Sequence, residues 1–185
     1  MVLSKNDAEH YWRYAHAPVM PQILIIGYGN PLRGDDAAGW IVAERLRENL
    51  APVDPVQIVT VHQLMPELAE PISQADLVIF IDAASQGDSP GAWKCQAADS
   101  RATVSPSNFG HHVTPAELLA YARCVFQACP RALVVSIAAE SFELGAPLSA
   151  PVRRAANEVT RHLIEKIHPF GTTLEISKID SPGRR

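Results

Sequence analysis

Carboxylates and imidazoles recur where apolar segments of this sequence end. They stand in three separate loops: Asp35 and Asp36 in the first, Asp82 in the second, and His111 with His112 in the third. Two carboxylates and one imidazole drawn from three loops suit a divalent transition metal that keeps open coordination positions. The residue types therefore allow a metal site, provided that the fold brings the loops together.

Each of these residues also has a simpler interpretation. One of Asp35 and Asp36 is expected to cap the helix that follows, because Asp is a favoured N-cap residue. Two adjacent acids are more than capping needs, so the second acid is a candidate ligand. Asp82 could equally form a turn, and a histidine pair in a loop is usually solvated. The residues alone leave these alternatives open.

The elements that must position these loops alternate along the chain. Apolar, β-branched runs predict strands at 22–26, 56–61, 76–82 and 132–138, with an edge strand at 91–96. Helices are predicted at 35–50, 66–73, 114–128 and from Ser149 to about 167. The start of the third helix is well marked, because Thr114, Pro115 and Glu117 form a capping box.

This alternation predicts an α/β fold. We expect three layers, with a twisted, mostly parallel sheet of about five strands and helices on both faces. Sites in such sheets form outside the carboxyl ends of the strands. The loop 27–36, the stretch after Asp82, the His111 loop and Glu140 would then share one edge of the sheet.

Composition favours one domain. The chain has 185 residues, 47% hydrophobic residues, a net charge of −4 and three cysteines. These values argue against nucleic acid or an anionic membrane as partners and favour reduced thiols. No apolar run approaches the ~18 residues of a membrane span, so we expect a cytoplasmic protein. We expect a single domain over 1–185, with its core at 22–167, an N-terminal arm at 1–20 and a flexible tail at 169–185.

Other catalytic motifs find little support. The turn at Gly27 and Gly29 suggests a dinucleotide fingerprint, but Leu32 stands where the third glycine is needed. Two carboxylates directly before the helix would also repel a pyrophosphate. The sequence contains no GxSxG elbow, GxxxxGK[ST] phosphate loop or HExxH helix.

Four segments, in order, resemble the hydrogenase maturation proteases, which trim the large subunit of nickel–iron hydrogenases. The first, ILIIGYGNPLRGDDAAGW, resembles the family signature G-x-G-N-x-x-x-x-D-[DE]-x-x-G. The others are PELAEPISQADLVIFIDAA, GHHVTPAELL and AAESFELGAPLSAPV. The resemblance covers about residues 22–167, and it implies a twisted sheet sandwiched by helices.

The resemblance also implies roles for particular residues. The family's metal-contacting positions fall on Asp36, Asp82 and His111, with His111 preferred to His112 because of its distance to the acid in the following helix. Members act in the cytoplasm on a large-subunit precursor that already holds nickel, and they remove its C-terminal extension. Asp35 or Asp36 is then a candidate to activate water or assist proton transfer.

Two departures and one choice of mechanism accompany the resemblance. Many members carry Asp-Glu where this chain has Asp35 and Asp36, so the carboxylate is one methylene shorter here. The segment before Gln22 lies outside the family core. We expect the nickel to arrive with the substrate. In the alternative mechanism, the protease carries its own metal ion and a metal-bound water. The alternative functions are a non-catalytic maturation chaperone and a dinucleotide-binding protein.

Overall fold

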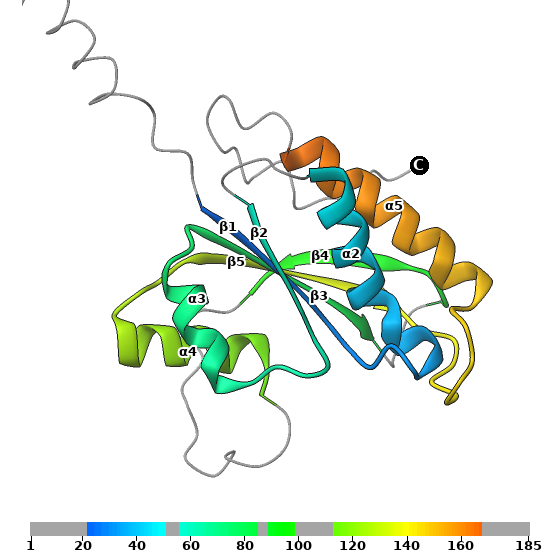
Figure 1. The fold of residues 1–185 in the computed structure, drawn as a ribbon, viewed down its shortest axis with the longest axis horizontal. Coiled ribbons are helices and arrows are strands. Elements are labelled where there is room, and N and C mark those ends of the chain that lie inside the picture. The colour runs from blue at the N-terminus through cyan, green and yellow to red at the C-terminus, as the bar shows by residue number, and fades with distance from the viewer. Residues whose placement is uncertain (1–21, 51–55, 85–88, 99–112, 168–185) are drawn as a thin grey trace, which may run out of the picture.

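A five-stranded sheet forms the centre of the computed structural model, which describes residues 22–50, 56–84, 89–98 and 113–167 (Figure 1). Its strands are β1 (Ile23–Tyr28), β2 (Val56–Val61), β3 (Leu77–Ala84), β4 (Trp93–Ala97) and β5 (Arg131–Ala138). They lie in the order β2-β1-β3-β5-β4, and all neighbours are parallel except β4, which runs antiparallel to β5. The mostly parallel sheet and the edge strand are as predicted.

Helices cover both faces of this sheet. Figure 1 shows α2 (Ala38–Leu50) and α5 (Ala150–Ile167) on one face, and α3 (Ala69–Ser73) and α4 (Pro115–Phe126) on the other. Two 3₁₀ turns, η1 (Gly34–Ala37) and η2 (Pro66–Leu68), lead into α2 and α3. The predicted three-layer α/β fold is therefore confirmed. No helix in the described part of the chain is long and apolar enough to cross a membrane.

The apolar run of β1 is continuous because both of its faces are buried. Ile23 and Ile25 belong to the core under α2 and α5, whereas Leu24 and Ile26 belong to the core under α3 and α4. A strand that is covered on both sides loses the usual polar alternation. This property made the strand easy to recognise in the sequence.

Some predicted boundaries shift. The segment 35–50 is divided, because Gly34–Ala37 forms a 3₁₀ turn before α2 begins at Ala38. The third helix keeps its predicted capping box but ends at Phe126 rather than 128, since Gln127 adopts a left-handed conformation (φ 57°). The predicted arm at 1–20 and tail at 169–185 lie outside the described residues.

Glycines let α2 approach the sheet closely. A Cβ on Gly39 would meet the carbonyl oxygens of Ile81 and Tyr28, and a Cβ on Gly27 would meet the carbonyl oxygen of Gly39. Any larger residue at these two positions would push α2 away from β1 and β3. The close approach brings η1, which carries Asp35 and Asp36, to the carboxyl ends of these strands.

Candidate functional site

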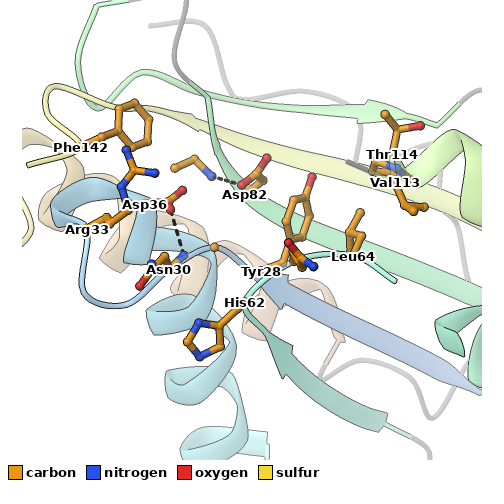
Figure 2. Close-up of a pocket in the computed structure, with 14 residues that line it drawn as sticks. Tyr28, Asn30, Arg33, Asp36, His62, Leu64, Asp82, Val113, Thr114 and Phe142 are labelled. Atoms are coloured by element: carbon orange, nitrogen blue, oxygen red, sulfur yellow. Dashed lines mark hydrogen bonds between the residues drawn. The ribbon is translucent and has the colours of Figure 1, made fainter. Parts of the chain in front are cut away.

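A cleft of about 640 Å³ opens at the carboxyl edge of the sheet (Figure 2). We call it the carboxylate cleft, because Asp36 and Asp82 both line it. The loops after β1, β2 and β5, the end of β3 and the segment that enters α4 form its walls. The lining residues are Tyr28, Gly29, Asn30, Arg33, Asp36, His62, Gln63, Leu64, Asp82, Ala83, Val113, Thr114, Pro115 and Phe142.

Asp36 is positioned by the turn that follows β1. The backbone N–H of Asn30 donates to Asp36 Oδ2 at 3.0 Å, so the carboxylate holds the turn in place. Gly29 adopts a φ of 130°, and a Cβ there would meet the carbonyl oxygen of Asp36. Packing within the turn therefore accounts for a glycine at position 29, seven residues before Asp36.

Asp82 projects from β3 into the same cleft. The backbone N–H of Ala83 donates to Asp82 Oδ1 at 2.7 Å. Burial, joined by the nearby charge of Asp36, raises the pKa of Asp82, and hydrogen bonds from Tyr28 and Ala83 lower it, so that the pKa is about 6. Asp82 can therefore gain and lose its proton on the acid side of neutral pH.

Tyr28 is a partner of Asp82 that the sequence analysis missed. Gly27 pairs with Ile81 in the sheet, so the next residue on β1 lies beside the next residue on β3. Burial, the negative charge of Asp82 and a hydrogen bond to that carboxylate raise the pKa of the Tyr28 phenol well above its ordinary value. Tyr28 is thus a neutral hydroxyl that donates to Asp82. Figure 2 shows its ring beside Asp82 in the cleft.

Asp35 lies apart from the cleft, although it adjoins Asp36 in sequence. It is only 1% exposed. Its Oδ2 accepts the backbone N–H groups of Glu140 (2.8 Å) and Ser141 (3.1 Å), and its Oδ1 accepts that of Ser149 (2.7 Å). Burial opposes ionisation, but these three donors hold the pKa of Asp35 below its ordinary value. The carboxylate fastens the loop between β5 and α5 to η1.

The predicted histidines, His111 and His112, lie outside the described residues. Val113 and Thr114, which follow them directly in the sequence, line the carboxylate cleft. A different histidine, His62, also lines it from the end of β2. Its ring makes an edge-on contact with Trp40, with 5.2 Å between the ring centroids, and it points away from Asp36 and Asp82 in Figure 2.

The described part of the cleft offers two carboxylates but no complete metal site. Among the residues that the structure describes, no group of three His, Cys, Asp or Glu side chains could hold a metal ion. Asp36 and Asp82 are close enough for the charge of one to raise the pKa of the other. A cation or a shared proton between them would relieve this repulsion. The pair can therefore bind a metal held by further ligands, or act in proton transfer.

A family model and several solved structures match this chain. A family model described as hydrogenase maturation protease matches residues 41–166, which is more than half of the chain. The [NiFe] hydrogenase maturation protease HycI from Thermococcus kodakarensis KOD1 shares 27% identity and a TM-score of 0.65, over 80% of this chain and 93% of that one. A search among curated proteins found no significant match.

More distant structures have the same fold. The hydrogenase maturating endopeptidase HybD from E. coli is 23% identical, with a TM-score of 0.64 over 81% of this chain and 94% of that one. The hydrogenase 2 maturation peptidase from Thaumarchaeota archaeon SCGC_AB-539-E09 is 20% identical, with a TM-score of 0.56 over 78% and 96%. Because the family model matches more than half of this chain, the chain belongs to the hydrogenase maturation protease family.

Proposed function

We propose that this protein is an endopeptidase that removes the C-terminal extension of a nickel-loaded precursor of a nickel–iron hydrogenase large subunit. One observation carries the proposal within the family: Asp36 and Asp82 come from different loops and line the same cleft. The solved relative from Thermococcus kodakarensis is named for [NiFe] hydrogenase, which supports this class of substrate. The proposed partner is the large-subunit precursor, and the proposed compartment is the cytoplasm.

Nickel is proposed to arrive as part of the substrate. Asp36, Asp82 and His111 are the proposed contacts, and Val113 brings the chain into the cleft two residues after His111. Carboxylate and imidazole ligands suit a divalent metal, and three of them leave coordination positions for groups of the precursor. Recognition of the metal would then restrict cleavage to precursors that have been loaded.

Of the two adjacent acids, Asp36 has the better geometry for chemistry. Three backbone N–H groups occupy the Asp35 carboxylate, whereas one backbone N–H group binds Asp36 and the residue faces the cleft. We propose that Asp36 helps to accept a proton from the attacking water. Asp82, whose pKa is about 6, is proposed to contact the metal in its ionised form and to be oriented by Tyr28.

The decisive experiment mixes the purified protein with nickel-loaded and nickel-free precursor and measures the mass of the large subunit. We expect the loaded precursor to lose its extension, even with enzyme that has been treated with a chelator and then freed of it. Efficient cleavage of nickel-free precursor by metal-reconstituted enzyme would instead indicate a protease that carries its own metal. Binding without any cleavage would favour the chaperone function.

Two matched variants connect the reaction to the cleft. Asp36→Asn removes a carboxylate that lines the cleft, and we expect processing to fall by at least 100-fold. Asp76→Asn removes a carboxylate at the opposite end of β3, where it accepts the Gln22 N–H at 2.8 Å. Processing by Asp76→Asn should equal that of the wild type, and equal losses in both variants would contradict the proposed site.

A further inference from the structure

A second cavity, of about 590 Å³, adjoins the carboxylate cleft. We call it the Met65 groove. The two cavities share His62 and Gln63, so the groove continues the cleft along the end of β2. Val61, Met65 and Leu68 are among its lining residues, and the surface turned toward it is almost entirely apolar. It thus differs in chemistry from the cleft, which carries two carboxylates.

The groove has a fixed floor and an adaptable rim. Val61 and Leu68 pack against the core under α3 and α4, so their positions are set by the fold. Met65 is 47% exposed and belongs to neither core. A thioether side chain adapts its shape readily to an apolar partner. Exposure of such a side chain beside a binding cleft is typical of a surface that becomes covered in a complex.

The strand beside the groove lies at the edge of the sheet, where β1 is the one described neighbour of β2. Val61 turns its carbonyl toward β1, because it accepts the Gly29 N–H at 3.2 Å. Alternation along the strand then turns the backbone groups of Thr60 and Ile58 outward. The Ile58 carbonyl already accepts a hydrogen bond from the Arg47 guanidinium at 3.1 Å. Thr60 lies beside the groove, and its outward backbone N–H and carbonyl are the groups with which a further strand could pair.

These features point to a peptide partner. An extended chain that pairs with Thr60 would place alternate side chains on opposite faces and could insert one of them into the Met65 groove. The same chain would continue through the shared residues His62 and Gln63 into the carboxylate cleft. We infer that the Met65 groove is the subsite for an apolar side chain of the precursor, close to the bond that is cut. The inference rests on the proposed function.

Processing kinetics provide the first test. Met65→Asp places a charge at the rim of the groove. We expect kcat/KM for the nickel-loaded precursor to fall about tenfold, chiefly through a higher KM. The magnitude corresponds to losing the burial, by the bound precursor, of about half of a methionine side chain. Met65→Leu should retain the wild-type value. Val125→Asp is the matched control, since Val125 is 67% exposed on α4 and lines neither cavity. Wild-type kinetics of Met65→Asp would overturn the inference.

Crosslinking provides a test that needs no cleavage. A benzophenone amino acid at position 65 should crosslink to the C-terminal part of the nickel-loaded precursor, at or beside an apolar residue, and one at position 125 should not. Crosslinks only to a second copy of this protein, or equal crosslinking from both positions, would refute the subsite. Crosslinking at position 65 without cleavage would support the subsite and refute the peptidase reaction. Cleavage without crosslinking at position 65 would support the peptidase reaction and refute the subsite.

Discussion

Asp82→Asn should stabilise the protein while abolishing its activity. Burial and the charge of Asp36 raise the pKa of Asp82 from 3.8 to about 6. Moving a carboxyl pKa by this amount costs about 3 kcal/mol of folding free energy once the group is ionised in both the folded and unfolded states. Asn carries no charge and keeps an oxygen that can accept the Ala83 N–H. The substitution should therefore recover most of this energy.

The pH dependence gives the prediction its sign. A carboxyl group with a raised folded-state pKa favours folding below 3.8, and this contribution is lost as the pH rises toward 6. The stability gained by Asp82→Asn should accordingly be about 3 kcal/mol at pH 7.5 and about 1 kcal/mol at pH 4.5. At neutral pH the gain corresponds to a rise in Tm of about 6–12 °C for a chain of this size.

Urea denaturation of metal-free protein in a chelator at both pH values would measure this gain. The chelator matters because a bound divalent ion would offset the repulsion between the carboxylates. Asp76→Asn is the control for loss of a carboxylate outside the cleft, and it should show no comparable gain. If Asp82→Asn were no more stable than the wild type at pH 7.5, or equally stabilised at pH 4.5, the desolvation argument would be refuted. Rapid processing by the variant would remove Asp82 from the site.

Three further substitutions test the neighbouring residues. Tyr28→Phe removes a hydrogen bond that lowers the pKa of Asp82, so the acid limb of the pH–rate profile of processing should move to higher pH. Asp35→Ala leaves three part-buried backbone N–H groups without their charged acceptor, and urea denaturation at pH 7 should show a loss of about 3 kcal/mol, which shrinks below pH 4 as the wild-type carboxyl is protonated. His111→Ala should slow precursor processing far more than His112→Ala, and the reverse order would shift the assignment by one residue.

The fold was predictable where the signal is local or repeated along the chain. Buried strands show as continuous apolar runs, and Thr114, Pro115 and Glu117 mark the start of α4 because all the capping interactions lie within four residues. The order of β-strands in the sheet follows from contacts between distant segments, and it could not be read from the sequence. The close packing of Gly39 against Ile81 is likewise visible only in the structure.

The site was predictable in part, for the same reason. Asp36 and Asp82 end up in one cleft because the carboxyl ends of parallel strands share an edge. Tyr28 was missed because its role depends on the register between β1 and β3, which carries no local signal. Asp35 accepts donors that lie 105 to 114 positions further along the chain, so no window of sequence could reveal its environment.

Asp35 and Asp36 are adjacent, identical side chains, and their different environments give them different roles. Three backbone donors favour the charged form of Asp35 and use its oxygens, so this carboxylate contributes to the stability of the loop between β5 and α5. Asp36 accepts one described backbone donor and faces Asp82, where its charge raises the pKa of the neighbour. The hydrogen bonds of Asp35 stabilise the fold, whereas the repulsion between Asp36 and Asp82 lowers the stability of the folded protein. Such a cost is expected at a site that is completed by a positively charged ligand, which on our proposal is the nickel of the precursor.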